Sequence, residues 1–287
     1  MVETAQSYTG ERNMHRYLYT KFAATEYGRS LGQKVRYDRY RPDSVSNNEW
    51  EKVLGPDVNN LKHLALTYGL TKHFVEAQNA SLSKQHPDLF TPQEQGILLV
   101  TAIVHDWGES VSGDWMFDLK TRANEEQEES VLAMLIAEIA EEEIDTRLSN
   151  HIIKKVLGDK TSKLGRAFNA IERLGYLRTG MRAWQQSYNT NGELREGLIW
   201  LSENVFHNQI PTLIEYAKDY SPVLNALTNS SPIISDALEN IPNDIFTKYD
   251  RPGEADKNKR FFEDAKDKWF ESGFANTSNL QNGFGGL

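Results

Sequence analysis

A predicted helix that ends in a histidine and an aspartate is the feature that most constrains this sequence. Thr91-Pro-Gln-Glu94 has the form of a capping box with proline at the first helical position, so a helix is predicted to begin there. The apolar run that follows, "QGILLVTAIV", carries this helix to His105. A buried strand is the weaker interpretation, because the capping signal comes first. A core helix therefore presents His105 and Asp106 at the edge of the core.

Helical patterns also dominate the rest of the chain. Gly55-Pro56-Asp57 predicts the start of a helix that continues to Gln78. This helix has apolar residues on nearly all sides, and His63 falls on the stripe that also holds Leu66, Leu70 and Phe74, so His63 is expected to be buried. Further helices are predicted at about 124–144, 146–157, 163–187 and 193–208, followed by shorter elements interrupted by proline and asparagine. Strand signals are scarce, and the predicted fold class is all-α.

The amino-acid composition excludes several classes of function for this chain. The chain has no cysteine, which excludes disulfides, zinc–thiolate sites and thiol nucleophiles, so any metal must be held by His, Asp and Glu. The net charge of −9 argues against a stable nucleic-acid partner. The longest apolar run, Gly96–Val104, is about half the roughly 20 residues that a membrane span needs, and the N-terminus lacks the apolar core of a signal peptide. We therefore expect a cytoplasmic protein without a membrane partner.

Charged side chains are distributed unevenly along the sequence. Lys and Arg gather between Arg12 and Arg41, and Glu and Asp gather between Glu125 and Asp145. Both stretches are most simply interpreted as solvated faces. The basic stretch can also supply an arginine that contacts phosphate.

Four side chains suit a common metal ion. His105 and Asp106 are adjacent, so they point about 100° apart on a helix and can share an ion only near its end, where Trp107-Gly108 follows. Glu172 lies on a mainly apolar stripe with Phe168 and Tyr176, where an unpaired carboxylate is costly.

Each of these residues also has a structural interpretation. The histidines can be ordinary core residues, Asp106 a helix-terminal carboxylate, and Glu172 a partner of Arg173 or Arg178. Burial of His63, His105, Asp106 and Glu172 becomes inexpensive if one divalent cation accepts all four.

The segment His105-Asp-Trp-Gly-Glu-Ser-Val-Ser-Gly-Asp114 resembles the "HDxxExxxGD" pattern of the bacterial 5′-deoxynucleotidases. These belong to the HD-domain metal-dependent phosphohydrolases, whose ligands are a His, a His-Asp pair and a distant acidic residue. The resemblance covers about residues 56–185. It implies an HD-domain helical bundle with additional C-terminal helices. The expected segments are a basic N-terminal segment (1–50), a phosphohydrolase core (51–190) and a helical extension with a loose tail (191–287).

Carried over to this sequence, the resemblance implies that His63, His105 and Asp106 are metal ligands. Glu172 stands where the family has its last ligand, normally Asp, and Asp145 and Asp159 are the fallback candidates. Lys62 is a second departure, since close relatives tend to have Glu just before the first His.

Glu109 and Asp114 match the two acidic residues around the reacting phosphate. The chemistry also needs such groups, because water must lose a proton and the departing sugar oxygen must gain one. The structural alternatives are a helix-end charge for Glu109 and a cap of the next element for Asp114.

The resemblance implies a phosphohydrolase that acts on nucleotides, first of all a 5′-deoxynucleotidase that releases phosphate from deoxynucleoside monophosphates. The alternatives are a triphosphohydrolase of deoxynucleoside triphosphates and a nucleotide-binding protein with weakened catalysis. The ligand set suits one divalent ion of Mn, Fe, Co, Ni or Zn, and Mg less well. Relatives often dimerise, so a homodimer is a further implication.

Overall fold

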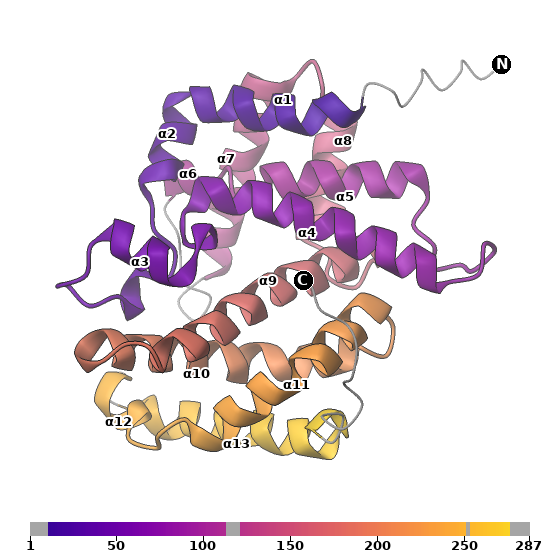
Figure 1. Ribbon diagram of the computed structural model, residues 1–287. Coiled ribbons are helices and arrows are strands. Elements are labelled where there is room, and N and C mark those ends of the chain that lie inside the picture. The colour runs from indigo at the N-terminus through magenta and orange to yellow at the C-terminus, as the bar shows by residue number, and fades with distance from the viewer. Residues whose placement is uncertain (1–10, 113–120, 251–252, 276–287) are drawn as a thin grey trace. The chain divides into compact units, whose positions relative to one another are not determined.

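The part of the chain that the structure describes is folded almost entirely into helices. The computed structural model describes residues 11–112, 121–250 and 253–275 (Figure 1). Within these ranges there is no β-strand, and the extended pairing consists of an isolated antiparallel bridge between Val35 and Asn59. The predicted all-α class is confirmed. No described helix combines the length and the apolar character that crossing a bilayer requires.

The contacts divide the chain into two compact units, and each unit takes two stretches of sequence. The first unit holds the described residues up to Arg36 together with Pro56–Ile171. The second holds Tyr37–Gly55 together with the described residues from Glu172 onward. These boundaries differ from the expected divisions near residues 50 and 190. Residues 37–55 belong to the second unit because they pack there, as the Tyr40 ring shows by meeting the Trp200 ring at 4.6 Å.

The first unit is built around an antiparallel pair of helices, α4 (Asn60–Ser81) and α5 (Pro92–Val104), which lie side by side in Figure 1. The other elements of this unit are α1 (Glu11–Ala24), α2 (Glu26–Gln33), the 3-10 turn η3 (Pro56–Val58), α6 (Glu109–Ser112), α7 (Arg122–Ala140), α8 (Thr146–His151), the π-helical segment η4 (Ile152–Leu157) and the first part of α9 (Lys163–Ser187). Their apolar faces form one core cluster around α5.

Local capping chemistry sets the ends of these two central helices. Both hydrogen bonds of the capping box between Thr91 and Glu94 are present, so α5 begins as predicted, and His105 is its C-terminal cap. The predicted helix start at Pro56 is wrong. Residues 56–58 form one 3-10 turn, and α4 begins at Asn60 because the Asn59 side chain accepts a hydrogen bond from the Lys62 backbone N–H.

Three further helices of the first unit can be compared with the predicted ranges. The helices expected at 124–144 and 163–187 are present as α7 and α9. The helix expected at 146–157 is α-helical in α8 and continues as a π-helix in η4, where Gly158 N–H bonds to the Ile153 carbonyl five residues back.

The second unit contains longer helices than the sequence predicted. Its elements are η2 (Asp38–Tyr40), α3 (Asn47–Leu54), the remainder of α9, α10 (Gly192–Tyr216), α11 (Ser221–Asn240), α12 (Ile245–Tyr249) and α13 (Ala255–Glu271). Prolines were expected to interrupt this region, but Pro211 lies inside α10 and Pro232 inside α11. A proline inside a helix costs about 3 kcal/mol. Burial of Leu213 and Tyr216 beyond Pro211 offsets this cost. The tail expected to be loose falls mostly on residues 276–287, outside the described residues.

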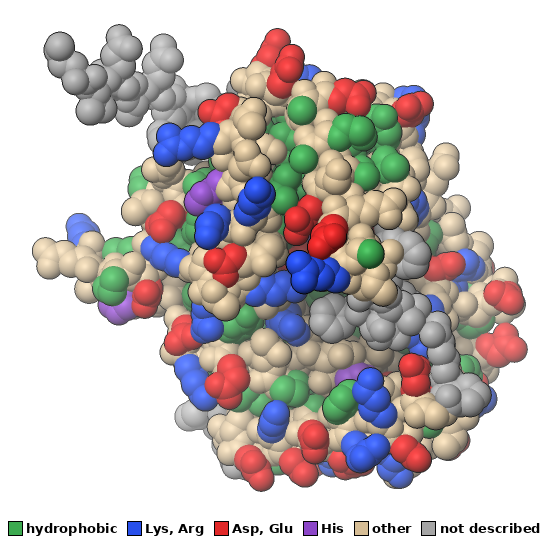
Figure 2. All heavy atoms as spheres, turned by 180° about the vertical axis from the view of Figure 1, so that it is seen from behind, with side chains coloured by type: hydrophobic (Ala, Val, Ile, Leu, Met, Phe, Trp, Pro, Cys, Tyr) green, Lys and Arg blue, Asp and Glu red, His purple; other side chains and the backbone are tan. Residues whose placement is uncertain are grey.

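The acidic stretch is solvated, in line with its simplest interpretation. Glu125, Glu126 and Glu129 on α7 are exposed. On the face drawn in Figure 2, acidic and basic side chains lie interspersed.

The turn between α5 and α6 is fixed by its two central residues. Trp107 is fully buried and stacks on Phe22 of α1, with ring centroids 4.4 Å apart and planes 5° from parallel. At Gly108, an added Cβ would lie 2.9 Å from the backbone oxygen of Glu128 on α7. The position of the turn is therefore fixed by the packing of Trp107 in the core and by the close approach of Gly108 to α7.

Replacement of Gly108 by Ala is expected to destabilise the protein by about 1–3 kcal/mol, because α7 or the turn must shift to admit the methyl group. Gly69→Ala is the matched control. Gly69 is exposed on α4 with no atom within 4 Å of its added Cβ, so this change should stabilise by up to about 1 kcal/mol through helix propensity. Urea unfolding of both variants measures the difference. Equal stability of the two variants would contradict the close approach at Gly108.

Candidate metal centre

Three of the predicted ligands converge on one point in the first unit. His63 lies on the buried side of α4, and His105 caps the end of α5, which runs antiparallel beside it. The two Nε2 atoms are 3.3 Å apart. The Oδ2 atom of Asp106, in the following turn, lies 3.6 Å from Nε2 of His63 and 3.2 Å from Nε2 of His105. These residues form the one group in the described part of the chain with metal-ligand spacing.

The size of this triangle fits a metal ion. For these three separations, the point equidistant from the atoms within their plane lies about 2 Å from each of them. Bonds from zinc to imidazole nitrogen and carboxylate oxygen have this length, and somewhat larger ions fit slightly above the plane. The prediction that adjacent His105 and Asp106 can share an ion at a helix end agrees with this geometry.

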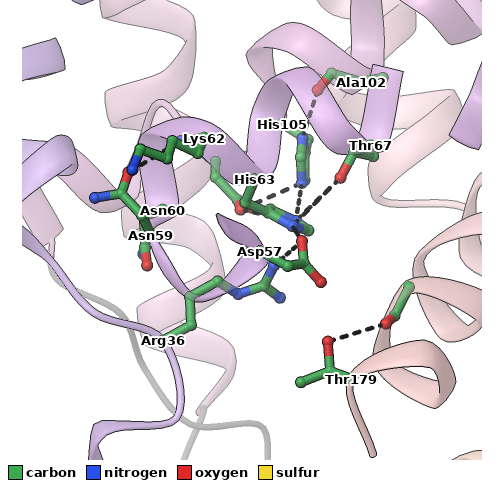
Figure 3. Close-up of polar contacts among 12 residues, drawn as sticks. Arg36, Asp57, Asn59, Asn60, Lys62, His63, Thr67, Ala102, His105 and Thr179 are labelled. Atoms are coloured by element: carbon green, nitrogen blue, oxygen red, sulfur yellow. Dashed lines mark hydrogen bonds and ion pairs between the residues drawn. The ribbon is translucent and has the colours of Figure 1, made fainter. Parts of the chain in front are cut away.

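Both imidazole rings are oriented through their other nitrogen. The Nδ1 atom of His63 lies 2.8 Å from Oδ1 of Asp57, and the Nδ1 atom of His105 lies 3.1 Å from the backbone oxygen of Ala102 (Figure 3). These oxygens only accept hydrogen bonds, so each Nδ1 carries the hydrogen and each Nε2 presents a lone pair. Two lone pairs and a carboxylate oxygen therefore face one another.

The protonation states of this group also suit metal binding. Burial, and next the positive charge of Arg36, lower the pKa of the His63 imidazole to about 4, although the Asp57 and Asp106 carboxylates oppose the shift. His63 is therefore neutral at pH 7, the form that binds metals. Burial raises the pKa of Asp106. The charges of His105 and His63 in their protonated forms, a hydrogen bond from protonated His105 and the charge of Arg36 outweigh burial and hold this pKa below its ordinary value. Asp106 is ionised at neutral pH.

Arg36 and Asp57 form the side of the site next to His63. Both are buried, with 8% and 5% of their surface exposed, and Nη1 of Arg36 lies 3.9 Å from Oδ1 of Asp57. The backbone joins them as well, since Arg36 N–H donates to the Val58 oxygen at 2.7 Å beside the Val35–Asn59 bridge. Neither residue stands out individually in the sequence. Arg36 was one of many arginines in the basic stretch, and Asp57 was interpreted as a helix start.

The turn after Asp106 leads to the first predicted acid/base residue. Glu109 is the first residue of α6, and its Oε2 accepts a hydrogen bond from Nδ2 of Asn60 at 3.1 Å. Asn60 is fully buried and lies one helical turn before His63 on α4. The Lys34 ammonium donates to the Glu109 backbone oxygen. The Glu109 side chain is thus held by Asn60, one helical turn from His63. Asp114 lies outside the described residues.

The fourth predicted ligand is not part of this group. Glu172 is half-buried on α9, at the position where the chain passes into the second unit. Its neighbour Arg173 donates to the Asn208 backbone oxygen at 3.1 Å and to the Gln209 side chain at 2.7 Å. Phe168, four residues before Glu172 on the same helix, packs against the His105 ring at 5.4 Å. The role of Glu172 as a ligand stays a prediction.

The two fallback ligands have local structural roles. Asp145 caps α8 by accepting a hydrogen bond from the Leu148 N–H at 2.7 Å. Asp159 accepts hydrogen bonds from the N–H and hydroxyl of Thr161 at 3.1 and 2.6 Å. Lys62, the second departure from the family pattern, is exposed.

No family model, curated protein or solved structure matches this chain.

Replacement of Asp106 by Ala is expected to weaken binding of Zn²⁺ or Co²⁺ by at least about 100-fold, because it removes a direct ligand, whereas loss of an outer partner typically costs about 10- to 100-fold. Asp159→Ala is the control, because it removes a carboxylate whose contacts are with Lys155, Thr161 and Ser162. Calorimetric titration of metal-stripped protein measures both affinities. If Asp106→Ala bound the metal with unchanged affinity, His63, His105 and Asp106 would not form the metal site.

Proposed function

We propose that this protein is a divalent-metal-dependent phosphohydrolase of the HD type, and that it hydrolyses deoxynucleoside 5′-monophosphates. The observation that carries the proposal is the convergence of His63 Nε2, His105 Nε2 and Asp106 Oδ2, all within 3.6 Å of one another, with both Nδ1 atoms already bound to acceptors. A fully satisfied structural histidine pair would not direct two lone pairs and a carboxylate at one point.

The order of the residues along the chain supports this choice among metal-dependent reactions. A first histidine on one helix, a His-Asp pair at the end of the next and an acidic residue three positions later resemble the deoxynucleotidase pattern. Glu109 is held against Asn60, one turn from His63, so it lies beside the ligand group rather than on a remote helix end. This placement favours a role for Glu109 in the reaction.

The residues of the site have separate proposed roles. His63, His105 and Asp106 hold the ion, which when bound supplies a Lewis acid for a phosphoryl oxygen and lowers the pKa of a water molecule. A guanidinium group can form paired hydrogen bonds with phosphate. The buried Arg36 is therefore our choice for the phosphate-contacting arginine expected from the basic stretch. Glu109 manages the proton that the attacking water loses or that the leaving sugar oxygen gains.

Several parts of the proposal come from the sequence. Asp114 is proposed as the second acid/base residue, and Glu172 as the fourth ligand in place of the usual Asp. Nitrogen and carboxylate ligands suit Mn, Fe, Co, Ni or Zn better than Mg. A homodimer and a cytoplasmic location belong to the same proposal.

Phosphate release from a panel of nucleotides tests the reaction class. Metal-stripped protein supplied with Mn²⁺, Co²⁺, Zn²⁺ or Mg²⁺ is expected to release phosphate from deoxynucleoside monophosphates only when metal is added, and Asp106→Ala should abolish this release. Release of tripolyphosphate from deoxynucleoside triphosphates would instead identify a triphosphohydrolase. Nucleotide binding without hydrolysis under every metal would favour a binding protein, particularly if Glu172→Asp gained activity.

Glu109→Gln is expected to lower kcat by about 10²- to 10⁴-fold, the usual contribution of a general acid or base, while metal affinity stays unchanged. The amide keeps the size of the side chain but cannot exchange the proton. Glu125→Gln on the exposed face of α7 is the control and should retain full activity. Steady-state kinetics and metal titration of both variants give the comparison. A Glu109→Gln protein with unchanged kcat would exclude the acid/base role.

A further inference from the structure

The two metal-binding histidines differ in the group that accepts their Nδ1 hydrogen. His105 donates to a neutral backbone oxygen, that of Ala102, at 3.1 Å. His63 donates to a carboxylate, that of Asp57, at the shorter distance of 2.8 Å. Both side chains of the second pair are 7% exposed. Burial of a carboxylate is costly unless it is paired, so the use of Asp57 here requires a reason.

The surroundings of His63 explain why a strong acceptor is needed at Nδ1. The Nε2 atom also has groups nearby that would stabilise a hydrogen on it, namely Asp106 Oδ2 at 3.6 Å and the Thr67 hydroxyl at 3.2 Å. A ring with its hydrogen on Nε2 would direct it at Nε2 of His105, 3.3 Å away, and would take both nitrogens from a metal ion. An ionised acceptor at Nδ1 favours the other tautomer, which leaves the Nε2 lone pair for a metal.

Neighbouring groups balance the charge of Asp57 and fix its position. The Arg36 guanidinium, 3.9 Å from Oδ1 of Asp57, offsets its negative charge. The short turn η3 that carries Asp57 is fixed by the hydrogen bond between Arg36 N–H and the Val58 oxygen, and the Asn59 side chain bonds to the Gly32 oxygen at 2.8 Å. Figure 3 shows Arg36, Asp57 and His63 in this order.

We propose that Asp57 is a positioning residue that fixes the tautomer and the direction of the His63 ring for metal binding, with Arg36 as its counter-ion. This inference rests on the proposed function, because it assigns Asp57 to the same metal site. Asp57 acts through His63 and has no direct contact with the substrate.

Two substitutions at Asp57 and one control separate positioning from simple stability. Asp57→Asn keeps an oxygen acceptor without the charge, and Asp57→Ala removes the acceptor. Asp145→Asn is the control, since Asn caps a helix as well as Asp does. Titration of the full, metal-stripped chain with Zn²⁺ should show affinity about 10-fold weaker for Asp57→Asn, about 100-fold weaker for Asp57→Ala and unchanged for the control. If Asp57→Ala fails to fold, Asp57→Asn alone decides.

The tautomer provides a readout that a merely structural role would not move. Long-range ¹H–¹⁵N NMR of the metal-free protein should place the His63 hydrogen on Nδ1, and Asp57→Ala should shift it toward Nε2 while the other histidines keep their signals. Wild-type affinity and an unchanged tautomer in both folded variants would overturn the role of Asp57 alone. Absence of metal binding by the unsubstituted protein would overturn the proposed function, and with it this inference.

Discussion

In the first unit two imidazole nitrogens and a carboxylate oxygen lie within 3.6 Å of one another, and unprotonated nitrogens beside a carboxylate repel it unless a positive charge lies between them. The α4–α5 pair brings His63 and His105 to one place, and the turn after α5 adds Asp106. Trp107 in the core and Gly108 against α7 hold that turn. The stability of the surrounding helices is therefore what keeps three mutually unfavourable atoms together.

The sequence predicted the parts of the site that depend on local chemistry. A capping box marks the start of α5, and the end of its apolar run locates His105 and Asp106. The predicted burial of His63 is confirmed, although Leu66 and Leu70, on the same predicted stripe, are only half-buried. These inferences succeed because they depend on the 3.6-residue period and on hydrogen bonds between residues three or four positions apart.

The parts that the sequence did not predict depend on contacts between distant segments. Arg36 and Asp57 meet because residues 34–36 pair with residues 58–60, and no local pattern encodes this pairing. Asn60 looks in the sequence like an ordinary first residue of a helix. Its side-chain amide nevertheless donates a hydrogen bond to Glu109, which lies 49 positions later in the chain. The helix predicted at 193–208 is present but continues to Tyr216 as α10, and α11 was not predicted. In both helices burial overrides the local effect of a proline, Pro211 or Pro232.

The path of the chain between the two units limits how this protein can be dissected. Residues 37–55 leave the first unit directly after Arg36 and return at Pro56, and their Tyr40, Trp50 and Leu54 side chains are buried. A fragment cut at residue 171 would keep His63, His105 and Asp106 but lose Glu172, the proposed fourth ligand. It would also expose the Tyr40 ring, which packs against Trp200 in the intact chain. Such a fragment would tend to aggregate, and replacing residues 37–55 with a short polar turn would be needed to obtain the first unit alone. The residues on either side of this segment lie close together, because Val35 and Asn59 form a backbone bridge, so the replacement requires only a few residues.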